Sequence, residues 1–275
     1  MKNKIIHRVD DRRVGRERDM FAGLVERLDG LNRRQVLKGA AAGLTGMLLG
    51  SMTSLLWPRE SRADEAVKTG KFIFPRLQFK VNDETKDIWN TGLIGDAHLR
   101  KKLRELTNIN VSEEAKVVRL SDFDDLCQHP FVFMTSEGSF ELPDNEQKNV
   151  REFLERGGFI HSDDCVYTHG GKAEDRFFKA YVKLMDKLFP DNPMRKIPLD
   201  HELFKIYYEF PKGSPHLQGV DHGAFGLFEP GTGRIMTICT AGDLHCGWMN
   251  QWFGEKANLE AMKMGINIIM YFLSH

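Results

Sequence analysis

The sequence predicts an α/β fold built on a doubly wound parallel sheet, with helices on both faces of the strands. Short apolar runs of strand length alternate along the chain with amphipathic runs of helix length. The apolar runs are continuous, which is typical of strands buried on both faces. Successive βα units with right-handed crossovers then predict a three-layer sandwich of flavodoxin-like strand order.

The elements follow one another in a regular order. Apolar runs predict strands at residues 72–79, 116–120, 131–135, 159–162 and 235–240. Amphipathic patterns predict helices at residues 96–106, 144–156, 174–188 and 258–273. Gly157 and Gly158 follow the second helix, where a glycine C-cap is expected.

Residues 191–233 interrupt this alternation and predict a Pro/Gly-rich insertion that folds over one edge of the sheet. Their prolines and glycines predict loops, while several aromatic residues argue against disorder. A hairpin of residues 223–228 and 234–239, joined by Gly231-Thr232-Gly233, is expected to close the insertion.

The N-terminal region resembles a twin-arginine (Tat) signal peptide. Arg33 and Arg34 precede an uncharged run at residues 39–57, and Ser61-Arg62-Ala63 supplies small residues for cleavage. We therefore expect a signal peptide with an extended n-region at residues 1–63, a single domain at residues 64–275, and export by the Tat translocase to the periplasm or another extracytoplasmic compartment. The alternatives are an uncleaved membrane anchor, which would be the only membrane contact, and a short cytoplasmic regulatory segment for the residues before the arginines.

Charge argues against nucleic acid as a partner. The chain holds 39 basic and 39 acidic residues, of which 13 and 7 lie in residues 1–63, so the predicted mature chain carries 26 against 32. This net charge of −6 also argues against anionic membrane surfaces. The 212 remaining residues suit one domain. The four cysteines include no C-x-x-C pair; Cys239 and Cys246 are the nearest pair in sequence, and Cys239 is expected to be a buried free thiol.

Polar residues follow the predicted strands, at the end where ligands bind in open α/β sheets. The candidates are Glu137, His161, Asp163, Asp164, Cys165, Asp243 and His245, with His201 and His222 from the insertion. Imidazoles and carboxylates that converge from separate loops suit zinc, manganese or iron. We expect Asp163, His222, Asp243 and His245 to hold the ion, and Glu137 or Asp164 to move protons.

Each candidate also has a structural interpretation. His161 could be a satisfied core histidine, Asp163 and Asp164 could cap the next helix or turn, and His222 could lie in a turn. His201 follows Asp200, a candidate helix N-cap.

Cys165 could instead be a nucleophile activated by His222 or His245. Its neighbour Asp164 weakens this reading, because a carboxylate opposes thiolate formation.

Several motifs together resemble an uncharacterised prokaryotic domain of unknown function, numbered 4159. They are residues 74–77 (FPRL), 130–138, 154–165, 200–202 and His222-Gly223. The resemblance implies a class I glutamine-amidotransferase-like fold and no established activity. The glycine-flanked cysteine of the amidotransferases is absent. Residues 157–161 are also similar to the trehalose-utilisation group, which favours a carbohydrate-like ligand.

The expected function is a metal-assisted hydrolase or isomerase of a small polar or carbohydrate-like ligand. The alternative is a non-catalytic periplasmic binding or assembly protein, in which the same polar residues form loop caps and hydrogen-bond networks.

Overall fold

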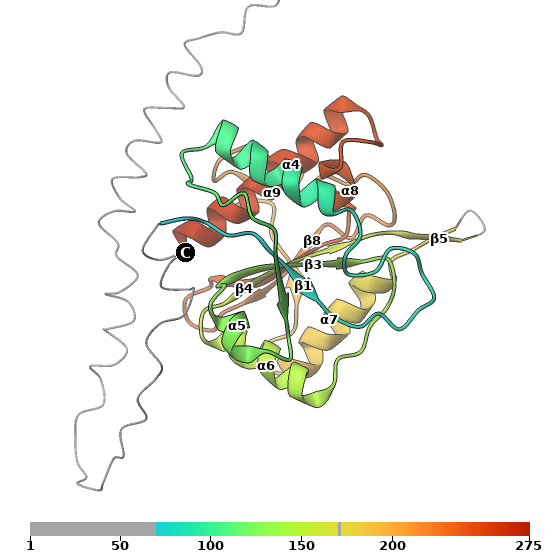
Figure 1. The fold of residues 1–275 in the computed structure, drawn as a ribbon, viewed down its shortest axis with the longest axis vertical. Helices are drawn as coiled ribbons and strands as arrows, with labels where there is room; N and C mark the ends of the chain where they lie inside the picture. The colour runs from blue at the N-terminus through green and yellow to red at the C-terminus, as the bar shows by residue number, and fades with distance from the viewer. Residues whose placement is uncertain (1–69, 170–171) are drawn as a thin grey trace, which may run out of the picture. The chain divides into compact units, whose positions relative to one another are not determined.

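A computed structural model describes residues 70–169 and 172–275, and it confirms the α/β architecture there (Figure 1). The strands are β1 (Pro75–Gln78), β2 (Lys116–Arg119), β3 (Phe131–Ser136), β4 (Phe159–Asp164), β5 (Tyr167–His169), β6 (Lys172–Glu174), β7 (Arg195–Lys196), β8 (Ala224–Phe228) and β9 (Ile235–Thr240). The helices are α4 (Leu93–Leu106), α5 (Phe123–Cys127), α6 (Asp144–Glu155), α7 (Arg176–Leu188), the 3₁₀ turn η1 (Glu202–Phe204), α8 (Leu244–Trp248) and α9 (Glu255–Ser274). The predicted signal segment, with Arg33 and Arg34, lies outside the described residues.

Seven of the strands form one mostly parallel sheet, in the order β2-β1-β3-β4-β9-β8-β7. The first five strands of this order are parallel to their neighbours, and β8 and β7 add to the edge as antiparallel strands. The predicted hairpin is confirmed, because β8 pairs antiparallel with β9. The insertion was expected to fold over the sheet edge. Two of its segments, β7 and β8, instead join the sheet as additional strands.

Both faces of the sheet are buried, which explains the continuous apolar runs. On β3, Phe131 and Phe133 point to one face, where their rings contact Phe272 of α9 and Trp248 of α8. The alternate residues Val132 and Met134 join a core cluster with side chains of α6 and α7. Figure 1 shows the same division, with α4, α8 and α9 on one side of the sheet and α5, α6 and α7 on the other.

Strands β4 and β9 are the neighbours that organise the site. They are parallel, with Asp163 opposite Thr240, so the segments that follow them leave from the same edge of the sheet. We call this edge, formed by the carboxyl ends of the parallel strands, the carboxyl edge. The structure also contains elements that the sequence patterns did not predict, namely the β5–β6 hairpin, α5, α8 and β7. These elements are too short to show a period. No helix among the described residues is both long and apolar enough to cross a bilayer.

Candidate metal centre

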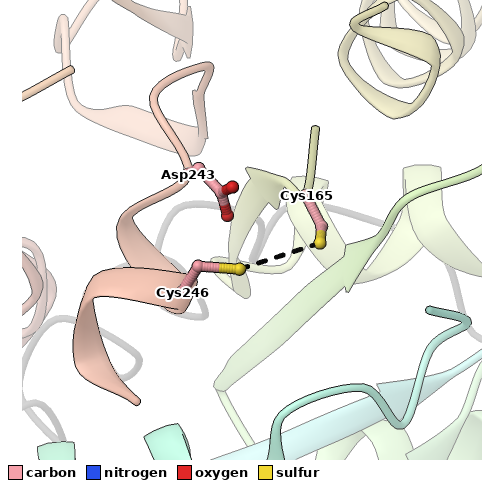
Figure 2. Close-up of side chains that lie close together, drawn as sticks. All are labelled: Cys165, Asp243 and Cys246. Atoms are coloured by element: carbon pink, nitrogen blue, oxygen red, sulfur yellow. Dashed lines mark hydrogen bonds between the residues drawn. The ribbon is translucent and has the colours of Figure 1, made fainter. Parts of the chain in front are cut away.

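Three potential metal ligands converge at the carboxyl edge. Cys165 comes directly after β4, whereas Asp243 and Cys246 follow β9, at the start of α8. One ligand atom from each residue lies within 4.8 Å of the other two, and all three residues are buried (Figure 2). We call these residues the Cys-Asp-Cys cluster.

The cluster is held together by local backbone geometry. Asp243 is the N-cap residue of α8 and has φ 57°, a left-handed conformation that aspartate tolerates better than most residues. Asp243 and Cys246 are three residues apart, so both can face Cys165 from one side of the short helix. The Cys165 and Cys246 sulfur atoms lie 3.9 Å apart.

One carboxylate oxygen of the cluster lacks a partner. Asp243 Oδ2 accepts a hydrogen bond from the Gln218 side chain, whereas Asp243 Oδ1 is buried without a hydrogen-bond partner. A buried oxygen in this state is costly unless a cation or another donor meets it. The cluster thus combines a ligand set with a buried carboxylate oxygen that a cation or a hydrogen-bond donor could satisfy.

The pKa values of all three residues of the cluster are raised. The hydrogen bond with Cys246 raises the pKa of Cys165 well above its usual value, and burial adds to this shift. For Cys246, the hydrogen bond from Cys165 lowers the pKa, but burial and nearby Asp243 outweigh it and the net shift is upward. Burial raises the pKa of Asp243 as well. A metal that binds here must therefore displace protons from the thiols.

Asp163 lies beside the cluster, at the end of β4. Its Oδ2 accepts a hydrogen bond from the His245 backbone N–H at 2.8 Å, and its Oδ1 accepts one from the Thr240 hydroxyl. Burial raises the pKa of Asp163 to about 8, and the neighbouring charge of Asp243 contributes to the shift. Both carboxylate oxygens have protein partners, so Asp163 ties β4 to the start of α8.

Asp164 caps the next helix on the opposite face. Its Oδ1 accepts the Phe178 backbone N–H at 2.9 Å, in the first turn of α7, while its Oδ2 is buried without a partner. Burial raises the pKa of Asp164 well above its usual value. The predicted capping role therefore applies to Oδ1, whereas Oδ2 remains available to carry a proton.

His245 lies in a buried ion-pair network. Its Nε2 is 2.9 Å from Arg76 Nη2, 3.1 Å from the Gly92 carbonyl oxygen and 3.4 Å from Asp96 Oδ1. Arg76 also donates two hydrogen bonds to the Asp96 carboxylate. Burial lowers the pKa of His245, and its Nδ1 is buried without a partner. This network joins β1, α4 and α8.

His222 is paired with a different carboxylate. Its Nε2 lies 2.9 Å from Asp175 Oδ2, and its ring stacks on Phe178 with centroids 4.5 Å apart. Asp175 is the N-cap residue of α7, and its side chain is 2% exposed. The insertion does reach the carboxyl edge, because Gln218 bonds to Asp243 and the Val220 backbone N–H lies 3.4 Å from Asp175 Oδ1.

The remaining candidates lie in structural surroundings. His161 is buried in β4, with Nε2 3.2 Å from the Thr240 hydroxyl, and burial lowers its pKa to about 3, so it is neutral. His201, rather than Asp200, is the N-cap of η1, because its Nδ1 accepts the Leu203 N–H. Glu137 follows β3 and accepts a hydrogen bond from the Thr85 hydroxyl.

Of the four predicted metal ligands, the structure brings Asp243 into the cluster. Asp163 lies next to it, and His245 and His222 have the partners given above. Cys165, considered as a nucleophile, contacts Cys246 instead of a histidine. Cys246 was not among the predicted ligands. Two features pointed to it: it lies three residues after Asp243, and it follows β9, which pairs with β4, the strand that ends just before Cys165.

Comparison with known proteins identifies a family. The family model for a domain of unknown function, DUF4159, matches residues 74–273. This range runs from β1 into α9 and includes the whole Cys-Asp-Cys cluster. No curated protein matches the chain.

Proposed function

The chain belongs to the DUF4159 family, and we propose from its site geometry that it binds one divalent metal ion through Cys165, Asp243 and Cys246. The single observation that supports this proposal is the convergence of three buried ligand atoms within 4.8 Å at the carboxyl edge. The unpartnered Asp243 Oδ1 points to the same conclusion, because a bound cation would satisfy it.

The ligand types favour zinc. Thiolates are soft ligands, and two thiolates with one carboxylate match the sulfur and oxygen donors that zinc accepts. Manganese and magnesium prefer oxygen ligands, so two cysteines argue against them. Three protein ligands would leave a fourth position for water or substrate, as in catalytic zinc sites.

In the enzymatic form of the proposal, the protein is a metal-assisted hydrolase or isomerase of a small polar or carbohydrate-like ligand. The metal would lower the pKa of a bound water or polarise a carbonyl oxygen. Asp163 retains a proton near neutral pH, and Asp164 has an oxygen without a partner. Asp163, beside the cluster, and Asp164, on the opposite face of β4, can each hold or release a proton.

A non-catalytic form is favoured by a different observation, the burial of the ligands. Cys165, Asp243 and Cys246 are only 5%, 0% and 9% exposed. A metal enclosed in this way would join the end of β4 to the start of α8 and stabilise the carboxyl edge of a binding or assembly protein. The two forms differ in whether the fourth position admits solvent.

Metal content tests the proposal. We would purify the full chain without chelator or affinity metal, supply zinc, remove the unbound metal, and measure the bound zinc by mass spectrometry. We expect about one equivalent in the wild type, and a large loss in Cys246→Ser and Asp243→Asn. Cys127→Ser is the matched control, because Cys127 is an exposed free cysteine outside the cluster.

An absence of bound zinc in a folded wild-type sample would overturn the proposal, as would an equal loss in Cys127→Ser. The two forms can then be separated with a cobalt-substituted protein, whose visible spectrum reports coordination. A spectrum that changes when a small anion or thiol is added indicates an accessible fourth position and favours the enzyme. A spectrum that does not respond favours the enclosed structural site.

We also propose export by the Tat translocase, on the basis of Arg33, Arg34 and the uncharged run that follows them. Replacing both arginines with lysine should retain the protein in the cytoplasm, as fractionation of the producing cells would detect. Accumulation of the double variant outside the cytoplasm at the wild-type level would contradict this proposal.

The fold proposal is a flavodoxin-like sheet of the class I glutamine-amidotransferase-like type. The parallel strands β2, β1, β3, β4 and β9 follow one another in the 2-1-3-4-5 order of that class, and this order supports the proposal.

A further inference from the structure

The two thiols of the cluster face each other at contact distance. Cys165 Sγ and Cys246 Sγ are 3.9 Å apart, although the residues are 81 positions apart in sequence. A disulfide requires about 2.05 Å between the sulfurs, so the atoms would have to approach by about 1.9 Å in total. Shared between two side chains, this movement is about 1 Å each. Figure 2 shows the two sulfur atoms pointing toward one another.

This contact distinguishes the pair from the other cysteines. Cys127 is exposed at the end of α5, and Cys239 is buried within β9 as part of the hydrophobic core. Among residues 70–169 and 172–275, Cys165 and Cys246 are the one pair of cysteines in contact. Cys239, which is nearer to Cys246 in sequence, points into the core instead.

We propose that Cys165 and Cys246 form a redox-active dithiol, and that their disulfide and the bound metal are mutually exclusive states of one site. The metal half of this inference rests on the proposed function. The disulfide half rests on the sulfur–sulfur contact alone and can be tested without any metal.

The oxidation is a thiol–disulfide exchange with a small disulfide as oxidant. One cysteine sulfur attacks the oxidant, whose S–S bond breaks and releases one thiol, and a mixed disulfide forms. The second cysteine sulfur then attacks the mixed disulfide and releases the second thiol. Two cysteine thiols lose two electrons and two protons, and the oxidant gains both and becomes two thiols. Cys246 is the more exposed of the pair, 9% against 5%, so we expect it to react first, through the small fraction of its thiol that is ionised.

The consequence for the metal follows from the chemistry of the ligands. A thiolate binds zinc through its sulfur lone pairs, and a sulfur in a disulfide is no longer an anionic ligand. Oxidation would leave Asp243 as the one remaining ligand of the cluster, so zinc should be lost and should return after reduction. Exported proteins meet disulfide-forming conditions, which would make this exchange relevant in the proposed compartment.

The experiment uses the full chain, made metal-free with a chelator that is then removed. We would incubate it with bis(2-hydroxyethyl) disulfide, block free thiols with iodoacetamide under denaturing conditions, and map the peptides by mass spectrometry. We expect a cross-linked Cys165–Cys246 peptide pair that a reductant cleaves, with Cys127 and Cys239 alkylated. Cys127→Ser should form the same cross-link, and Cys246→Ser should not.

A second arm adds zinc before the oxidant, with binding measured separately. At a free zinc concentration about tenfold above its dissociation constant, the cross-link should form about tenfold more slowly. A cross-link together with this protection supports the inference. Zinc binding with no cross-link overturns it and leaves the proposed function intact. A cross-link in a protein that binds no zinc supports the dithiol and overturns the metal site, so the two failures are distinguishable.

Discussion

Replacing Asp163 with asparagine should remove a pH dependence from folding stability. In the native protein, burial raises the pKa of Asp163 to about 8, whereas its ordinary value is 3.8. Below about pH 4 the carboxyl group is protonated in both states, and its contribution to stability is fully present. As pH rises toward 8, the unfolded chain gives up this proton and the native protein keeps it, so stability is lost.

The magnitude follows from the difference between the two pKa values. Each pH unit well between the two values costs the native state about 1.4 kcal/mol. Because the native carboxyl is half ionised at pH 8, the loss between pH 6 and pH 8 is about 2 kcal/mol. Asparagine is similar in shape and does not titrate. Its oxygen can accept the His245 N–H, and its amide can donate to the Thr240 hydroxyl, which is 3.3 Å from the Ser162 carbonyl oxygen.

The assay is urea unfolding of the wild type and Asp163→Asn at several pH values from 5 to 9, with chelator present so that no metal alters the charges. The difference in unfolding free energy should shift in favour of the variant by about 2 kcal/mol between pH 6 and pH 8, and should level off above pH 8. Comparing the two proteins cancels the titration of His161 and Asp164, which both retain. Parallel stability curves would refute the reasoning, because they would show that Asp163 is ionised in the native protein.

Two further substitutions test the packing of β1 and α4 against α8. Arg76→Met should lower the unfolding free energy by about 3 to 5 kcal/mol in urea titrations, because it leaves Asp96 charged and buried without its partner. Gly92→Ala should cost more than about 2 kcal/mol, because Gly92 has φ 56° and an added Cβ would meet Met249 Sδ and lie 2.5 Å from His245 Cε1.

Matched controls separate these effects from general ones. Arg156→Met removes an arginine that is 55% exposed and paired with Glu152, and it should cost less than about 1 kcal/mol. Gly231→Ala tests backbone strain alone, because Gly231 has φ 88° and open space around the added Cβ. If Arg156→Met destabilises the protein as much as Arg76→Met, the loss of a buried ion pair is not the cause. If Gly231→Ala destabilises it as much as Gly92→Ala, the steric contact is not the cause.

The sequence predicted the main elements of the fold because strand and helix periods are local properties. Continuous apolar runs placed the five parallel strands near their observed positions, and the predicted hairpin of residues 223–228 and 234–239 matches β8 and β9. The addition of β7 to the sheet edge, beyond β8, was not predicted, because edge pairing depends on the partner strand rather than on a period.

The sequence also predicted that polar residues would gather at the carboxyl ends of the strands, but not which of them would meet there. Asp163 and Asp164 end β4, Cys165 follows it, and Asp243 and His245 follow the neighbouring strand β9 at the carboxyl edge. Which polar side chains pair is decided by distances of a few ångströms between segments far apart in sequence, and no local pattern contains them.

Tertiary structure therefore assigned the partners. It placed His245 against Arg76, 169 positions away, and His222 against Asp175, 47 positions away. It placed Cys165 against Cys246 because β4 and β9 are adjacent in the sheet, although four strands separate them in the chain. The residue types available for chemistry were determined by the sequence, and their combination into one buried cluster was determined by strand order.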